Sequence, residues 1–193
     1  MGRIAARNIV LRHRQPADVT IARSTHMPLF FIEMGQGIVA RPEVRVKTST
    51  IYSCTFITGW SNKTGFGGAY HYPSDCQEDD DVLATMALWA FYLKPTTVRL
   101  LFARKMMEPM GTKDSDKAFL RNWVTAECGV IPTSADAVAA RMRLTANLHF
   151  SAGDGAHVPG EFDDGVRDLS NMPAGDNSQD GFILVGRNRE RRW

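Results

Sequence analysis

The sequence predicts an α/β fold, a sandwich of mixed β-sheets with two main helices. Short β-type segments separated by turn residues fill the chain from residue 30 to residue 73. Two segments with helical patterns follow, at 82–93 and 114–128, and a β-type segment at 97–105 lies between them. This order of strands, helix, strand and helix is typical of layered α/β proteins.

The first predicted strands surround a Gly-Gln-Gly turn. Residues 30–42 contain two short apolar runs on either side of that turn, which indicates a strand pair or a bulged strand. The residues that follow alternate between β-type and loop composition. They are a strand at 44–48, a turn near 49–53, a strand within 52–60, a loop at 61–68 and a short β-type stretch at 69–73.

The two helices are predicted from their periodicity and from the residues at their ends. An acidic run at 78–81 precedes the first helix, where carboxylates interact favourably with the helix dipole. Apolar residues cover most of the circumference of this helix, so we expect it to be largely buried and to end before Pro95. Gly129 follows the second helix, at the position where a glycine commonly ends a helix.

The pattern is weaker beyond Pro132. Residues 134–142 are compatible with one or two helical turns, and residues 143–150 with a strand. Residues 151–180 are dense in Gly, Asp, Asn, Pro and Ser, which predicts one long loop or a partly disordered segment. A last strand is predicted within 181–187, before a basic tail.

We expect one domain with additional residues at its ends. A length of 193 residues fits one large domain, and 44% hydrophobic residues are enough to form a core. Residues 1–28 are interpreted as a basic N-terminal extension, and residues 29–150 as the main domain. The Gly/Asp-rich loop, last strand and basic tail at 151–193 are expected to belong to that same domain.

Composition argues against several classes of function. A net charge of +2 provides no basic surface typical of a nucleic-acid binder. No apolar run approaches the roughly 18 residues of a membrane span, so we expect no membrane insertion. Three cysteines (Cys54, Cys76 and Cys128) are too few for a disulfide scaffold and fit a reducing, cytoplasmic compartment.

Three residues of the β-rich half could act together. Thr48 lies six residues before Cys54, and His71 lies 17 residues after it. Taken singly, each is explained by packing, because free cysteines are often buried and threonine and histidine both occur in strands. Two adjacent antiparallel strands could nevertheless bring the thiol and the imidazole within hydrogen-bond reach, which activation of a cysteine nucleophile requires.

This arrangement resembles the chemoreceptor glutamine deamidase (CheD-type) family. In that family a Thr-x5-Cys-x16-His pattern supplies the catalytic groups, and the matching residues here are Thr48, Cys54 and His71. The stretch at 32–46 and the helix–strand–helix order downstream are also similar, so the resemblance covers roughly residues 30–130. It implies a CheD-like α/β sandwich and a bacterial protein with a place in chemotaxis.

The resemblance further implies a hydrolase that deamidates glutamine side chains on a protein substrate and needs no cofactor. Cys54 would attack the amide carbon as a thiolate, and His71 would activate the thiol and protonate the departing ammonia. Thr48 would orient the imidazole, as the third group of a triad does. Backbone N–H groups around Ser53 and Cys54 are candidates for stabilising the oxyanion.

The substrate is expected to lie against Ser53, Gly67, Gly68 and Tyr70. The aromatic residues near this site either line a cleft for an extended protein segment or fill the core. Related deamidase folds also occur in bacterial toxins and effectors, which act on glutamines of host proteins. The expected protein substrate is therefore either a chemoreceptor-like protein of the same cell or a host protein reached by a translocated effector.

Two alternatives use the same residues differently. The fold could be a non-catalytic protein-binding module that retains the threonine, cysteine and histidine, or another Cys-His acyl-transfer enzyme such as a protease or transglutaminase. A metal site is not predicted, because Cys54, His71, Cys76 and the acidic run at 79–81 match no zinc-ligand spacing.

Overall fold

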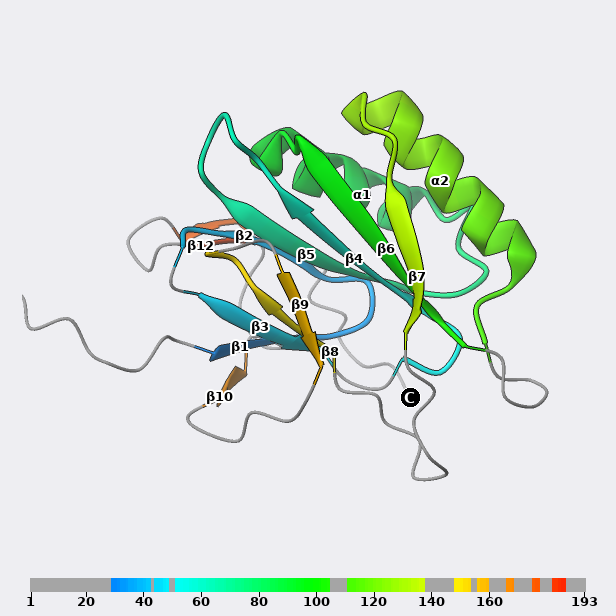
Figure 1. The fold of residues 1–193 in the computed structure, drawn as a ribbon, viewed down its shortest axis with the longest axis horizontal. Coiled ribbons are helices and arrows are strands. Elements are labelled where there is room, and N and C mark those ends of the chain that lie inside the picture. The colour runs from blue at the N-terminus through cyan, green and yellow to red at the C-terminus, as the bar shows by residue number, and fades with distance from the viewer. Residues whose placement is uncertain are drawn as a thin grey trace, which may run out of the picture.

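The computed structural model describes a fold of three layers (Figure 1). The larger of two β-sheets lies in the middle. Helices α1 and α2 cover one of its faces, and the smaller sheet packs on the other. The described residues are 29–42, 44–48, 51–104, 111–137, 148–153, 156–159, 166–168, 175–177 and 182–186. The strand order is β10-β1-β3-β8-β9 in the smaller sheet and β11-β12-β2-β5-β4-β6-β7 in the larger one.

The elements have the following bounds. The helices are α1 (Asp80–Leu93) and α2 (Asp114–Cys128). The strands are β1 (Leu29–Ile32), β2 (Gly37–Ala40), β3 (Arg45–Thr48), β4 (Thr55–Trp60), β5 (Gly67–Tyr72), β6 (Thr97–Ala103), β7 (Thr133–Ala137), β8 (Leu148–Ser151), β9 (Ala156–Pro159), β10 (Val166–Asp168), β11 (Gly175–Asn177) and β12 (Phe182–Val185).

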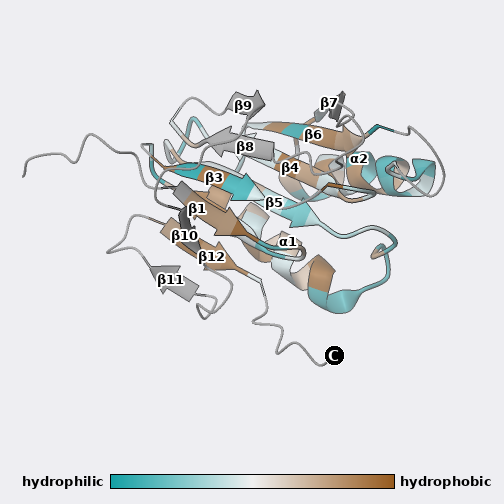
Figure 2. Cartoon of the chain, turned by 90° about the horizontal axis from the view of Figure 1, so that it is seen from below, coloured by the Kyte–Doolittle hydropathy of each residue, from teal (hydrophilic) through white to brown (hydrophobic). Residues whose placement is uncertain are grey.

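The larger sheet separates two hydrophobic clusters. Successive residues of a strand point to opposite faces, so Phe56 of β4 packs between the two sheets while Ile57 packs toward the helices. The helix-facing cluster includes Trp89 of α1 and Leu120 of α2. Hydrophobic colour accordingly dominates β4, β6 and β12, whereas much of α2 is hydrophilic (Figure 2). The inter-sheet layer is the one that positions the candidate site.

Both helices were predicted correctly in type and extent. The Asp79 carboxylate accepts hydrogen bonds from the backbone N–H groups of Asp81 and Val82, at 3.0 and 3.1 Å, and so caps α1. At the end of α2, Gly129 has a φ of +64°, the left-handed conformation that glycine adopts at low cost. Neither described helix is long and apolar enough to cross a membrane.

The predicted strand pair at 30–42 is only partly correct. Two strands form there, but β1 pairs in parallel with β3 in the smaller sheet, whereas β2 pairs antiparallel with β5 in the larger one. The turn between them therefore connects the two sheets rather than closing a hairpin. The predicted loop at 61–68 ends earlier, because Gly67 and Gly68 are the first residues of β5.

The prediction for the C-terminal third was wrong in two places. Helical turns at 134–142 are contradicted at their start, where β7 pairs in parallel with β6. The single loop at 151–180 is contradicted by β9, β10 and β11, which all pair within the two sheets. The last strand is confirmed as β12, next to β2. The N-terminal extension at 1–28 and residues 138–147 lie outside the described residues.

Candidate active site

The two sheets bring Thr48, Cys54 and His71 to one inter-sheet layer. His71 of β5 lies opposite Phe56 of β4, and Cys54 precedes Phe56 by two residues. Cys54 belongs to the same inter-sheet cluster as Phe56, so it lies on the side of the larger sheet that His71 also faces. Thr48 ends β3 in the opposite sheet, on the same buried face as Val46.

A hydrogen bond across the sandwich joins Thr48 and His71. The distance between Thr48 Oγ1 and His71 Nδ1 is 2.6 Å, and both side chains are buried. The backbone of His71 is also held, because its N–H donates to the Gln36 carbonyl at 2.9 Å and its carbonyl accepts from the Gly35 N–H at 2.8 Å. The imidazole therefore has a defined position and ring orientation.

The second ring nitrogen of His71 has a different environment. His71 Nε2 is buried and has no hydrogen-bond partner within the described part of the chain. Burial lowers the pKa of His71 from its ordinary value of 6.5 to about 4, so the ring is neutral at neutral pH. If Nδ1 carries the proton and donates it to Thr48, Nε2 presents a lone pair and can accept a proton.

The Cys54 thiol lies under Met34. Cys54 is 7% exposed, and its S–H donates to Met34 Sδ at 3.6 Å, whereas Met34 itself is 46% exposed on the turn between β1 and β2. Burial raises the pKa of Cys54, and the nearby Asp116 carboxylate adds a smaller increase. Hydrogen bonds from the backbone N–H and hydroxyl of Ser74 and from the N–H of Ser53 lower the pKa of Cys54 and partly offset the burial.

The backbone that carries Cys54 is fixed by a segment distant in sequence. Thr112 Oγ1 donates to the Cys54 carbonyl at 3.0 Å and accepts from the Ala103 N–H at 2.8 Å. The Gly111 N–H donates to the Tyr52 carbonyl at 3.0 Å. These contacts connect the end of β6 to the residues just before β4, so they set the position of the thiol relative to the sheet.

The residues predicted to border the substrate fall into two groups. Ser53 lies next to Cys54, and its hydroxyl accepts a hydrogen bond from Ser74 Oγ at 2.7 Å. Tyr70 is fully buried in the helix-facing cluster, on the opposite face of β5 from His71, with its hydroxyl 2.6 Å from Thr85 Oγ1. The structure thus gives Tyr70 a place in the core rather than beside the thiol.

Gly67 and Gly68 are sites of close packing. A Cβ at Gly67 would lie 2.7 Å from the Ala152 backbone, and one at Gly68 would lie 2.8 Å from Trp89 Nε1. Both positions therefore require glycine so that the smaller sheet and α1 can approach β5. This packing explains the Gly-Gly pair without a contact to substrate.

Sequence reasoning missed three residues that touch the site. Met34 covers the sulfur, Ser74 faces it, and Thr112 holds its backbone. The position of Ser74 three residues after His71, at the end of the same β-type stretch, is the only local signal among them. Thr112 and Met34 reach Cys54 only through the tertiary fold, and nothing in their own sequence neighbourhoods indicates this.

A large hollow among the described residues lies elsewhere. It has a volume of about 910 Å³ and is lined on the outer side of α1 by residues such as Ala87, Leu88 and Phe91. None of Thr48, Cys54 and His71 lines it. The thiol of the candidate active site is instead buried beneath Met34.

Comparisons with known proteins found no relative that explains this site, so it is interpreted from its geometry. No protein-family model matches the sequence, and a search of curated proteins found no significant relative. Among the residues that the structure describes, no cluster of three or more His, Cys, Asp or Glu side chains could hold a metal ion.

Proposed function

We propose that this chain is a cysteine amidohydrolase that deamidates glutamine side chains on a protein substrate. The observation that carries the proposal is the hydrogen bond between Thr48 and His71 Nδ1. Among the described residues, Nε2 of this neutral, buried imidazole has no hydrogen-bond partner, and it lies on the side of the sheet that also carries Cys54. A buried ring nitrogen without a partner costs folding stability, and a chemical role would explain why that cost is kept.

The reaction needs one nucleophile and one group that moves protons. As the Cys54 sulfur bonds to the amide carbon, its proton passes to His71 Nε2, and the carbonyl oxygen becomes an oxyanion. The imidazolium then protonates the amide nitrogen, the C–N bond breaks and ammonia leaves a thioester. Water, deprotonated by His71, attacks the thioester, and the products are glutamate and the regenerated thiol.

The raised pKa of Cys54 and the lowered pKa of His71 determine how the thiol is activated. Both shifts are caused mainly by burial, so the resting pair is a neutral thiol and a neutral imidazole rather than an ion pair. His71 therefore acts as a general base when the substrate is in place. Thr48 supports this step by fixing the ring through Nδ1.

The experiment uses protein mass spectrometry on two lysates, one bacterial and one eukaryotic. The purified chain is added to each, and proteins are screened for the mass shift of glutamine-to-glutamate conversion together with ammonia release. We expect conversion by the wild type and by Cys128→Ser, and a loss of about 10³-fold or more in Cys54→Ala. Conversion by Cys54→Ala would contradict the proposal, and the lysate that supplies the converted protein separates an own-cell substrate from a host substrate.

A non-catalytic binding module is the second candidate, and the burial of the Cys54 thiol favours it. It predicts no conversion in either lysate and no modification of Cys54 until the protein unfolds. A protease or transglutaminase would use the same cysteine and histidine. Peptide cleavage would identify the protease, and incorporation of an added amine the transglutaminase.

A further inference from the structure

Helix α1 has two apolar faces. One face is buried against the larger sheet, as expected for a helix that covers it. The other face, called the outer stripe, consists of four exposed apolar residues at the spacing i, i+3, i+4 and i+7, namely Ala84, Ala87, Leu88 and Phe91. A surface helix normally presents polar side chains outward, so a second apolar face indicates a site of contact with another surface.

The outer stripe borders a hollow and is widely exposed. Leu88 is 45% exposed and Phe91 is 65% exposed, and both line the hollow of about 910 Å³ beside α1. Ala84 and Ala87 line the same hollow. The two small side chains thus occupy the first half of the stripe, and the two large ones occupy the second half.

This order of sizes makes the outer stripe complementary to itself. Suppose that α1 of a second copy lies antiparallel to it, about a two-fold axis that passes between residues 87 and 88. Ala87 then faces Leu88 of the second copy, and Ala84 faces Phe91 of the second copy. Each large side chain meets an alanine, which leaves room for close packing of the two helices.

The charges at the ends of the outer stripe follow the same symmetry. Asp81 lies three residues before Ala84, Lys94 lies three residues after Phe91, and both are exposed. Lys94 Nζ is 6.0 Å from the centroid of the Phe91 ring, so its ammonium group lies beside the stripe. The same axis places Lys94 opposite Asp81 of the second copy, and this contact occurs twice. A parallel arrangement would instead place Lys94 opposite Lys94.

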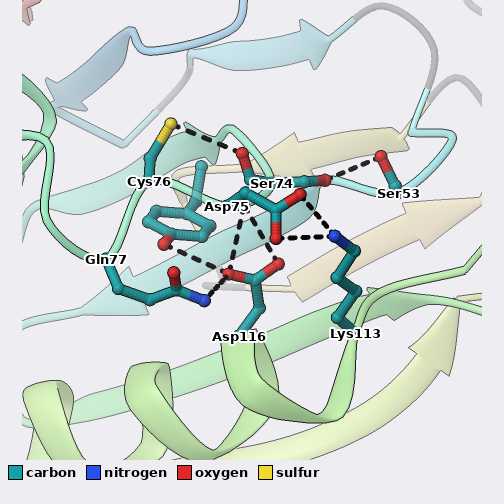
Figure 3. Close-up of polar contacts among 8 residues, drawn as sticks. Ser53, Ser74, Asp75, Cys76, Gln77, Lys113 and Asp116 are labelled. Atoms are coloured by element: carbon teal, nitrogen blue, oxygen red, sulfur yellow. Dashed lines mark hydrogen bonds and ion pairs between the residues drawn. The ribbon is translucent and has the colours of Figure 1, made fainter.

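The Lys94 ammonium is available for such a contact. Lys113 pairs with Asp75 of its own chain, at 2.6 and 2.9 Å (Figure 3). Among the residues that the structure describes, by contrast, no carboxylate lies within ion-pair distance of Lys94 Nζ. The other charged residues that line the hollow are Lys63 and Glu127, which have opposite signs and add no net charge.

We propose that the outer stripe is the interface of a homodimer, in which α1 packs antiparallel against α1 of a second copy of this chain. The interface is one helix wide, so the expected dimer is weak, with a Kd of about 10 µM. Cys54 lies on the opposite side of the larger sheet from the helices. The dimer therefore leaves the candidate active site uncovered, and the proposal does not depend on the proposed function.

The first test is sedimentation velocity of the full chain from about 1 to 500 µM. We expect the wild type to dimerise, and Leu88→Glu to raise the Kd at least about 100-fold, because it places two carboxylates next to the axis. Ile131→Glu is the control, since Ile131 is 85% exposed and lies outside the stripe. A monomeric wild type, a dimer unaffected by Leu88→Glu, or an equal loss in Ile131→Glu would overturn the proposal.

A charge exchange tests the register of the two helices. Lys94→Asp places two carboxylates opposite each other at both ends, and it should raise the Kd about 10-fold. Adding Asp81→Lys to the same chain restores opposite charges at both contacts and should return the Kd to within about threefold of the wild type. Additive losses in the double variant would contradict the antiparallel register.

Disulfide cross-linking tests the same register directly. Ala84→Cys and Phe91→Cys are made separately in a Cys128→Ser background, because Cys128 lines the hollow. Oxidation by copper phenanthroline should cross-link a mixture of the two variants much faster than either variant alone. Cross-linking of each variant with itself would indicate parallel helices and overturn the proposal. A monomer in which a thiol reagent fails to modify Phe91→Cys would show that the chain's own residues cover the stripe, which would also overturn it.

Discussion

His71 and Tyr72 are adjacent in β5 but serve two very different regions of the molecule. His71 faces the smaller sheet, where its ring Nδ1 hydrogen bonds Thr48, and its Nε2 has no partner in the described part of the chain. Tyr72 faces the helices, where its hydroxyl joins the hydrogen bonds around Asp116. One side of the strand thus holds a neutral proton acceptor, and the other holds an anion surrounded by donors.

The two sides of β5 thus have different roles: the His71 side carries the proposed reactive groups, and the Asp116 side supports the backbone. The Asp116 carboxylate is held by donors from the 72–77 segment (Figure 3), whereas among the described residues the inter-sheet layer leaves one imidazole nitrogen without a partner, on the side of the sheet that carries Cys54. Satisfied networks give rigidity, and a group left unsatisfied in a rigid setting is where chemistry is expected. Substitutions at His71, Thr48 and Met34 test whether the His71 side has this reactive character.

The largest expected effect is on the pH dependence of stability. The pKa of His71 is about 4 in the folded protein and near 6.5 when unfolded, so the unfolded chain binds more protons between these values. The contribution of His71 to the free energy of unfolding is fully present above about pH 6.5. It should fall by about 3 kcal/mol as the pH drops toward 4. Urea unfolding at pH 7 and pH 5 should show a smaller loss in His71→Gln, and equal losses in the two proteins would contradict the assignment.

A smaller effect is expected from Thr48. Thr48→Val keeps the shape of the side chain and removes the hydrogen bond to His71 Nδ1, which should lower the deamidation rate about 10- to 100-fold. Thr58→Val is the matched control, because Thr58 is equally buried and its hydroxyl has no partner among the described residues. Equal rates in the two variants would show that the Thr48 contact serves packing alone.

The smallest effect concerns access to the sulfur. Met34→Ala should raise the alkylation rate of Cys54 at neutral pH several-fold, because the Met34 thioether covers the thiol. Leu88→Ala removes an equally exposed apolar side chain from α1, far from the site in the layered fold, and should leave the rate unchanged. An unchanged rate in Met34→Ala would show that other groups control access.

The helices could be predicted from residues within or next to them, whereas several strands depend on pairing with distant segments and were not predicted. The acidic start of α1 and the glycine after α2 are signals that act within one turn, so both helices were predicted correctly. The alanine-rich residues of β7 have helical propensity, but parallel pairing with β6 overrides it. Strands β9 to β11 are short and rich in polar residues, so their pairing carried no periodic pattern.

Some residues of the candidate site could likewise be predicted from the sequence, and others could not. The spacing of Thr48, Cys54 and His71 suggested their association, and the structure places all three in the inter-sheet layer. Met34 and Thr112 were missed because they reach Cys54 only through the tertiary fold. The predicted substrate contacts of Gly67, Gly68 and Tyr70 remain without structural support, because these residues pack the core.

The most direct test of the coupling between Cys54 and His71 is the pH profile of Cys54 alkylation in the wild type and in His71→Ala. If Nε2 takes the thiol proton, the wild-type rate should be nearly constant from about pH 4 up to the pKa of the thiol. In His71→Ala the rate should instead rise about tenfold per pH unit with the thiolate fraction, and the two curves should meet at alkaline pH. Profiles that rise in parallel in both proteins would contradict a coupled thiol and imidazole, and would favour a binding module.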